Sequence, residues 1–137
     1  MREIKFQVFT TDWEGVTGCF EGYFLQLLDN GKYKVAFTNS DNDKEFITTE
    51  RENIRLFTGL KDNNGKKIYE KGIVKYKNYG EEHISKVIQD FRLGTGHYIK
   101  SPGIGFYSIN ERTIKDLEIE VIGNVFEDSH LLEEQHG

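Results

Sequence analysis

The chain has 137 residues and a formal net charge of −5 at pH 7, with 36% hydrophobic and 13% aromatic residues. This length and composition suit a globular chain with a core of its own, and the many aromatic residues and single proline exclude a wholly disordered one. The single cysteine, Cys19, excludes an intramolecular disulfide framework and favours a reducing, cytoplasmic location. The first residues lack the apolar run of a signal peptide and no stretch approaches the length of a membrane span, so we expect no membrane partner.

The first half of the chain has the periodicity of β-strands. Residues 23–28 and 32–37 alternate on either side of Asn30 and Gly31, a dipeptide typical of the type I′ hairpin turn. In the predicted hairpin, the odd-numbered residues from Tyr33 onwards face the core, and the lysines between them face solvent.

The order of segments predicts the fold class. Residues 13–57 contain a strand, a hairpin, an acidic loop, a strand and a last short segment at 52–56, which is typical of a small SH3-like or Tudor-like barrel. Residues 66–126 contain a comparable set of short strands. We therefore predict a mostly β fold with one or more small barrels and a short C-terminal helix, capped by Asp128 or Ser129.

The second half gives two clear strand patterns, at 72–76 and 117–121. No segment rich in proline, glycine and serine separates the two halves. We therefore predict a single domain over residues 1–137, and we keep two β subdomains, about 1–57 and 58–137, as the alternative.

One segment, residues 81–92, fits two structures. Ile84, Val87, Ile88 and Phe91 recur at helical spacing, whereas the surrounding pattern favours a strand. We interpret the segment as a strand and keep a helix as the alternative.

Three stretches carry a family resemblance: residues 1–6, 57–76 and 117–127. The central one joins Thr-Gly-Leu-Lys-Asp to an Asn-Gly turn and Ile-Tyr-Glu, which is not a generic β pattern. Together they resemble the YopX family of phage and prophage proteins. The chain departs from that family's pattern at Gly72, where an aspartate is common, and at residues 7–9, where Arg-Ala-Trp is common. The resemblance implies a phage or prophage origin, within a bacterial host cell, and no established activity.

The residues of these stretches have predicted structural roles. Gly59, Gly65 and Gly123 would allow main-chain angles or close approaches that a side chain forbids, and Asp62 would cap its turn. Five aliphatic residues would fill a core: Leu60, Ile68, Ile73, Val74 and Ile122.

We find no pattern that predicts catalysis. The four histidines do not fall at the spacing of a helical zinc pair, and residues 41–43 lack the glycine and glutamate of a calcium loop. We interpret residues 41–43 as a solvated hairpin tip and Cys19 as an inert thiol. The chain is expected to be no enzyme and to hold no cofactor or metal.

Charge is unevenly distributed along the chain. Residues 61–77 hold six lysines and two acidic residues, a local excess of +4, whereas residues 111–134 hold eight acidic and two basic residues, a local −6. This asymmetry predicts a homo-oligomer in which the lysines of one copy dock on the acidic residues of the next. Tyr69, Ile73 or Phe126 would supply its buried part. The candidate interaction residues are Lys61, Lys66, Lys67, Lys71, Lys75, Lys77, Tyr69, Glu118, Glu120 and Glu127.

Three hypotheses on function follow. The first is a non-enzymatic accessory protein that self-associates or binds a host or phage protein. The second is a nucleic-acid-binding module in which the lysines of 61–77 contact phosphates while Tyr76, Tyr79 and Tyr98 stack on bases. The third, an uncharacterised hydrolase, has no motif in its favour.

Overall fold

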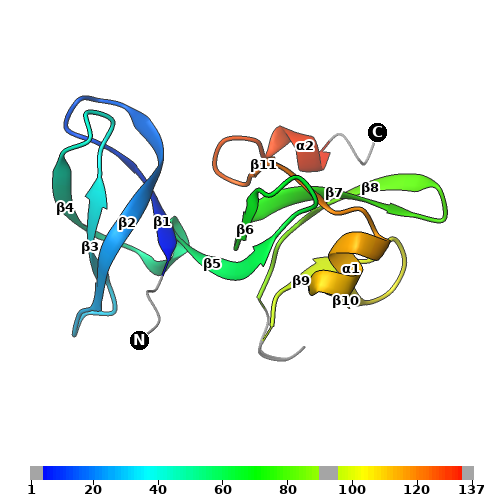
Figure 1. Cartoon of the computed structure of the whole chain (residues 1–137). Helices are drawn as coiled ribbons and strands as arrows, with labels where there is room; N and C mark the ends of the chain where they lie inside the picture. Colours follow the sequence, from blue (N-terminus) through cyan, green and yellow to red (C-terminus); the bar gives the residue numbers. More distant parts are fainter. Residues whose placement is uncertain (1–4, 90–95, 134–137) are drawn as a thin grey trace. The chain divides into compact units, whose positions relative to one another are not determined.

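A computed structural model describes residues 5–89 and 96–133 of the chain (Figure 1). The fold is mostly β, as predicted, with antiparallel strands and two very short helices. The chain divides into two compact units, unit 1 over residues 1–57 and unit 2 over residues 58–137.

Unit 1 is a meander of four strands and a fifth that returns to pair with the first. These elements are β1 (Phe6–Thr11), β2 (Thr17–Leu27), β3 (Tyr33–Thr38), β4 (Lys44–Thr49), a 3₁₀ turn η1 (Arg51–Asn53) and β5 (Ile54–Lys61), which continues into unit 2. The strand order is β4-β3-β2-β1-β5. β5 pairs with β1 through Ile54 to Leu56. The predicted 23–37 hairpin is confirmed, because β2 and β3 pair antiparallel with Leu25 opposite Val35.

The core of unit 1 consists of one face of this sheet. Phe6, Val8, Val35, Phe37 and Ile54 are its buried residues, each at most 1% exposed. Val35 and Phe37 therefore face the core as predicted. Alternation produces this core, because residues two apart on a strand point to the same face.

Four turns share one hydrogen-bond pattern, at residues 12–16, 28–32, 39–43 and 62–66. In each, the N–H of the first residue donates to the carbonyl of the fifth, and the N–H of the fourth donates to the carbonyl of the first. The fourth residue always has a positive φ: Gly15 83°, Gly31 84°, Asn42 66° and Gly65 83°. The prediction of a type I′ turn at Asn30 and Gly31 is wrong, because only Gly31 has a positive φ. Asn30 instead accepts the N–H of Lys32 on its side chain, in a three-residue loop.

Buried polar side chains join two of these turns at one end of unit 1. Both carboxylate oxygens of Glu45, which is 1% exposed, accept the N–H of Trp13, at 3.2 and 3.0 Å, and Asn39 Nδ2 donates to the same carboxylate at 2.7 Å. Asp12 accepts the N–H and the hydroxyl of Ser40. Burial raises the pKa of Asp12, but the hydrogen bonds, led by those from Ser40, hold it below its ordinary value. The main chain at Trp13 is thus fixed while its side chain is 75% exposed.

Unit 2 has a three-stranded antiparallel sheet and a separate two-stranded hairpin. Its elements are β6 (Lys67–Tyr69), β7 (Gly72–Asn78), β8 (Glu81–Lys86), β9 (Tyr98–Lys100), β10 (Phe106–Ser108), α1 (Glu111–Asp116), β11 (Glu120–Asn124) and α2 (His130–Glu133). The larger sheet has the order β11-β7-β8, β10 pairs with β9, and β6 lies next to β5. The short C-terminal helix α2 confirms the prediction of a helix there.

The first part of the ambiguous segment is a strand. Residues 81–86 form β8 and pair with β7, which confirms the strand interpretation over that range. Phe91, the last member of the helical stripe, lies outside the described residues, as do residues 1–4 of the first family-like stretch and His136. Pairing with β7 favours the strand over the helix, because it provides hydrogen-bond partners for main-chain N–H and C=O groups of β8.

Helix α1 was not predicted, and it displaces part of a predicted strand. Asn110 and Thr113 cap its first turn reciprocally. At its other end Ile119 N–H donates to the carbonyl of Ile114, and Glu118 has a φ of 50°, which is the arrangement of a Schellman motif. The predicted strand over 117–121 is therefore wrong for its first three residues, and β11 begins at Glu120.

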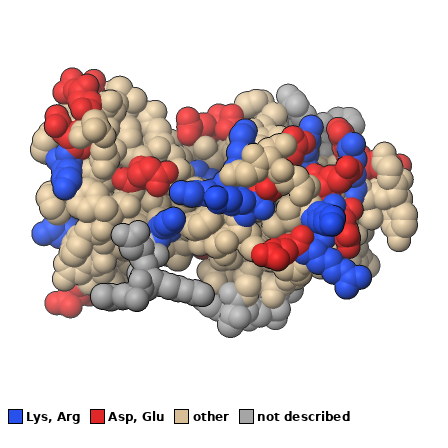
Figure 2. Space-filling model, in the orientation of Figure 1, with Lys and Arg blue, Asp and Glu red and all other residues tan. Residues whose placement is uncertain are grey.

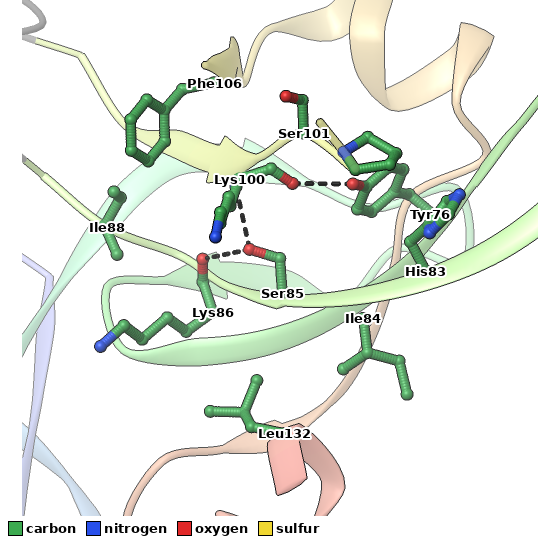
Figure 3. A pocket seen from close by; sticks show the side chains of 11 residues that line it. Tyr76, His83, Ile84, Ser85, Lys86, Ile88, Lys100, Ser101, Phe106 and Leu132 are labelled. Atoms are coloured by element: carbon green, nitrogen blue, oxygen red, sulfur yellow. Dashed lines mark hydrogen bonds between the residues drawn. The ribbon is translucent and has the colours of Figure 1, made fainter. Parts of the chain in front are cut away.

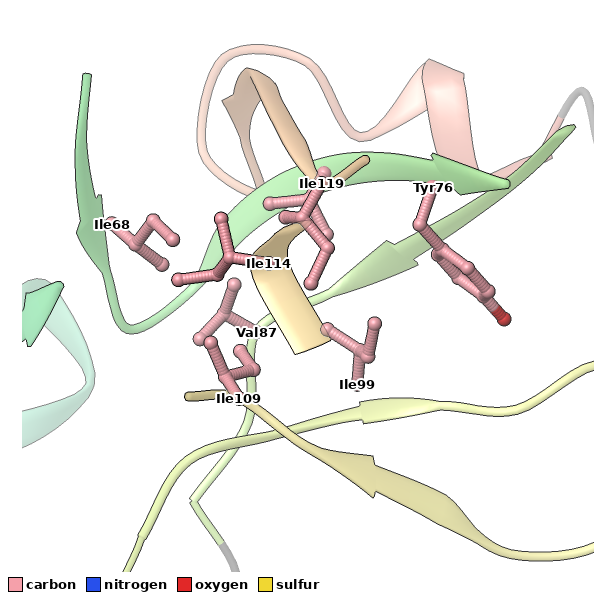
Figure 4. Packing of buried hydrophobic residues seen from close by; sticks show 8 residues of the cluster. Ile68, Tyr76, Val87, Ile99, Ile109, Ile114 and Ile119 are labelled. Atoms are coloured by element: carbon pink, nitrogen blue, oxygen red, sulfur yellow. The ribbon is translucent and has the colours of Figure 1, made fainter. Parts of the chain in front are cut away.

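The core of unit 2 gathers aliphatic side chains from strands and from α1 (Figure 4). Ile68, Val74, Ile99, Ile114 and Ile119 are each at most 5% exposed. Ile114 and Ile119, the two residues joined by the helix-ending hydrogen bond, both belong to this cluster. The hydrogen bond that ends α1 therefore joins two residues whose side chains are buried in the same core.

The sheets of the described residues are open. No closed barrel forms among residues 5–89 and 96–133, so only the coarser prediction of a mostly β fold is confirmed. In the same residues, no helix is long and apolar enough to cross a membrane.

Candidate functional site

The predicted lysine segment spreads over several elements of unit 2. Lys61 ends β5, Lys66 lies in the 62–66 turn, Lys67 begins β6, and Lys75 and Lys77 lie on β7. Lys71 has a φ of 63° between β6 and β7, and its ammonium lies 5.8 Å from the centre of the Phe126 ring.

Two of these lysines are paired with the acidic residues predicted to bind another copy. Lys75 Nζ lies 3.3 Å from Glu120 Oε2, and Lys77 Nζ lies 3.8 Å from Glu118 Oε2. Asn64, through a hydrogen bond, and Lys75 hold the pKa of Glu120 below its ordinary value. Figure 2 shows acidic and basic side chains next to one another over the part of unit 2 in view. Lys75 and Lys77 of the lysine segment thus pair with acidic residues of the same copy.

Head-to-tail docking through these residues stays a prediction. Lys75, Lys77, Glu118 and Glu120 form internal pairs, so docking between copies would first have to exchange them. Glu127, the third predicted acid, accepts a hydrogen bond from Asn124 at 3.1 Å. The pairs link residues far apart in the sequence, which is why a count of local charge did not reveal them.

Aromatic and aliphatic residues proposed for contacts are also placed differently. Tyr69 is 6% exposed, Ile73 is fully buried and Tyr76 is 2% exposed, so all three lie in the interior and are not available to a partner or a base. Phe126 is half-buried. Tyr79, at 98% exposure, is fully accessible. Ile73 and Tyr76 are buried because β7 is the central strand of its sheet, and consecutive residues at its start are buried on both faces.

The conspicuous motif around Asp62 is structural. Asp62 Oδ1 accepts the N–H groups of Asn64 and Lys66, as predicted, and Oδ2 accepts the N–H of Val121 at 2.8 Å. Gly59 and Gly65 have positive φ values of 89° and 83°. The sequence missed the bond to Val121, because no local pattern indicates which strand lies beside a turn.

Gly123 confirms the predicted close approach. A Cβ there would lie 2.4 Å from a carboxylate oxygen of Asp128, the residue that accepts the N–H of Asn124. Of the five predicted core residues, Ile68, Ile73 and Val74 are fully buried, whereas Leu60 and Ile122 are half-buried.

Unit 1 exposes aromatic residues on the face of its sheet that points away from the core. We call this surface the aromatic face; it consists of Tyr23, Phe24 and Phe46 with Lys34 and Lys44. Tyr23 is 46% exposed, Phe24 43% and Phe46 57%.

The strand register builds the aromatic face. Phe24 lies opposite Ala36, and Ala36 lies opposite Phe46, so the three form one row across β2, β3 and β4. A register shift between Gly22 and Phe24 marks a β-bulge, which accommodates Tyr23 as the extra residue. The sequence alternation around residues 23–28 did not reveal the bulge.

Two lysines cover rings of the aromatic face. Lys34 Nζ lies 5.6 Å from the centre of the Phe46 ring, and Lys44 Nζ lies 5.2 Å from that of Tyr23. Cation–π contacts of this length at exposed sites are worth about 0.5–1 kcal/mol. The face therefore combines apolar area with positive charge, in a chain whose net charge is negative.

Metal-ligating groups are not gathered in the described part of the chain. Among residues 5–89 and 96–133, no three His, Cys, Asp or Glu side chains are arranged to hold a metal ion. Residues 41–43 form the exposed tip of the 39–43 turn, as predicted. The carboxyl of Glu14 lies close to Asp41, and their hydrogen bond and mutual repulsion raise the pKa of Glu14 above its ordinary value. The tip is thus a set of repelling carboxyl groups.

Comparisons with known proteins identify a family. The family model described as YopX protein matches residues 5–133. No protein of curated function matches the chain.

Proposed function

Because the chain belongs to the YopX family, we propose that it is a non-enzymatic accessory protein of a phage or prophage that associates with a second copy of itself in the host cytoplasm. The observation that carries the proposal is the aromatic face of unit 1. Solvated faces of antiparallel sheets are normally polar, and exposed aromatic clusters mark interaction sites.

The position of β4 favours a second copy as the partner. β4 ends the sheet on one side, so its outer main-chain groups lie at a sheet edge. Edge strands are templates for pairing with another chain, and β4 contains no proline. Two copies of β4 that pair antiparallel about a two-fold axis would extend the aromatic row from one copy to the other.

The register of such a pair does not place like charges opposite one another. With Phe46 opposite Phe46, Lys44 of each copy lies opposite Thr48 of the other, so no like charges meet directly. Aromatic pairs across strands contribute about 0.2–1 kcal/mol each. This dimer replaces the head-to-tail contact, because its residues are not engaged in the internal pairs of unit 2.

We also propose that unit 1 is an SH3-like small barrel. The strand order β4-β3-β2-β1-β5, with a 3₁₀ turn before β5, supports this assignment. The assignment concerns topology, and the interaction proposal does not depend on it.

Light scattering coupled to size-exclusion chromatography tests the dimer. We expect the wild-type chain to have the mass of a dimer, and Phe46→Lys, which places a charge on the two-fold axis, to be a monomer. Tyr79→Lys makes the same change at a fully exposed tyrosine of unit 2 and should remain a dimer. Circular dichroism checks that both variants are folded. A wild-type chain that stays monomeric at its highest soluble concentration contradicts the proposal.

Single-stranded nucleic acid is the second candidate, on one specific observation. Lys34 and Lys44 lie over exposed rings, and stacking platforms beside lysines bind single strands. This version uses different residues from the 61–77 segment. Monomeric protein that binds single-stranded DNA with steep salt dependence, and that loses binding in Lys34→Gln, would favour this candidate over the dimer.

A further inference from the structure

Unit 2 contains a cavity at the β8 edge of its larger sheet. The cavity has a volume of about 520 Å³, which lies within the range of small-molecule sites. Its lining residues come from β7, β8, β9, β10 and α2 and from the segments beside them. Figure 3 shows Ser85 and Lys100 on one side of β8, and Ile84 and Leu132 on the other.

The wall combines cationic and apolar side chains. Lys86 and Lys100 line the cavity together with His83, and no aspartate or glutamate is among its described lining residues. The carboxylate of Glu81 lies 4.0 Å from His83 Nε2. The apolar part of the wall includes Ile88, Phe106 and Leu132, and Phe106 is 44% exposed.

Buried hydroxyl groups fix the main chain of both lysines. Ser85 Oγ accepts the N–H of Lys100 at 3.0 Å and donates to the carbonyl of Lys86 at 3.0 Å. The hydroxyl of Tyr76 donates to the carbonyl of Lys100 at 2.7 Å. Ser85 is 6% exposed and Tyr76 2%, so these bonds are shielded from water. Ser85 therefore fixes the main chain at both lysines, whose side chains lie on opposite sides of β8 (Figure 3).

We propose that this cavity binds a small organic anion with an apolar body. Lys100 would contact a phosphate, sulfonate or carboxylate group by charge-assisted hydrogen bonds, and Lys86 would add positive charge from the other side of β8. The ring of Phe106 with Ile88 would cover the body. The site lies wholly within unit 2. It goes beyond the proposed self-association, which uses unit 1, so either can fail while the other holds.

The test uses the full chain and the dye 8-anilinonaphthalene-1-sulfonate, which has an aromatic body and one sulfonate. We expect saturable dye fluorescence, and a dissociation constant that rises about tenfold or more when Lys86→Gln and Lys100→Gln are combined. Both lysines are exposed, so the double variant should fold normally. Phe106→Ala should also weaken binding, because it removes part of the apolar wall.

Controls separate the cavity from the aromatic face. Lys34→Gln and Phe46→Lys change only unit 1 and should leave dye binding unchanged. Dye binding that is lost in these two variants, or that is unchanged in the double lysine variant, overturns the proposal. So does the absence of saturable binding to the wild-type chain.

Competition identifies the body of the anion. Adenosine monophosphate offers a planar body and octanoate a flexible chain; displacement of the dye by either supports the proposal and shows which body fits. Displacement by neither overturns it. If inorganic phosphate displaced the dye equally well, the proposal that the cavity binds an apolar body would be overturned, because phosphate has no apolar group to bury.

Discussion

Asp12, Asn39 and Asp62 each begin a turn and accept two main-chain N–H groups from within it. Their second polar atom reaches another segment: Asp12 binds Ser40, Asn39 binds Glu45 and Asp62 binds Val121. A single short side chain thus shapes a turn and ties it to the rest of its unit. Such side chains are costly to replace, because buried donors would lose their acceptors.

Gly22 is the residue for which steric reasoning gives the sharpest prediction. A Cβ at this position would lie 2.1 Å from the ring of Phe6, which is 1% exposed and cannot move aside. We expect Gly22→Ala to lower the free energy of unfolding by about 1–3 kcal/mol, as for other overpacked cores. Urea denaturation followed by circular dichroism measures it.

Gly18→Ala provides the control for Gly22→Ala. Gly18 lies on the same strand, and a Cβ there would meet nothing within 4 Å. Its substitution should change the free energy of unfolding little. Equal effects of the two substitutions would show that the Phe6 contact is not what requires glycine.

At the scale of elements, the sequence correctly predicted the strands and turns that are determined by local residue patterns. The alternation in β3 gave the hairpin and its buried face, and Asp62 was correctly placed as a cap. Helix α1 was missed because it has six residues and buries only Ile114, too little for a helical period to show. The bulge at Tyr23 was missed because it depends on how β2 pairs with β3.

The candidate site was predicted less well than the fold, for a related reason. Lys75 and Glu120 pair because β7 and β11 are neighbours, and they lie directly opposite one another in the register. Charge counted along the chain contains no information on which strands pair. The same holds for the cavity, where Ser85 links the main chain of Lys86 to that of Lys100.

The tether between the 62–66 turn and β11 can be separated from the turn itself. Asp62→Asn keeps an oxygen for Asn64 and Lys66, as Asn39 has in its own turn, but puts an amide N–H₂ against the N–H of Val121. Asp62→Ala removes all three side-chain hydrogen bonds and leaves the main-chain bonds of the turn. We expect Asp62→Ala to lose about 1–3 kcal/mol of stability and Asp62→Asn less.

Amide hydrogen exchange checks the assignment. The Val121 amide should exchange faster in both variants, and the Lys66 amide only in Asp62→Ala. Asp29→Ala, at the equivalent exposed 28–32 turn, is the control and should change neither amide. Unchanged exchange at Val121 in Asp62→Ala would contradict the tether.

At the scale of the whole molecule, two separate cores predict two responses to mutation. Phe37 belongs to the core of unit 1 and Ile99 to that of unit 2, and both are fully buried. We expect Phe37→Ala to cost about 3–5 kcal/mol and Ile99→Ala about 2–5 kcal/mol. Each should speed amide exchange mainly within its own unit, measured by mass spectrometry of peptide fragments.

The same experiment tests the number of folding domains. Faster exchange throughout residues 5–133 in either variant would mean that the chain unfolds as one cooperative domain, which is the first prediction made from the sequence. Confinement to one unit would favour two β subdomains.

The exposure of Trp13 determines what tryptophan fluorescence can report about this protein. An indole ring in a core emits at shorter wavelength than one in water, and its emission moves to longer wavelength when the core opens. Trp13 is the single tryptophan and is already 75% exposed, although its main chain is held by Glu45. The emission of the folded chain should therefore resemble that of the unfolded chain, and tryptophan fluorescence will follow unfolding poorly. The same indole would report any molecule that covers the 12–16 turn, because its surroundings would then become less polar.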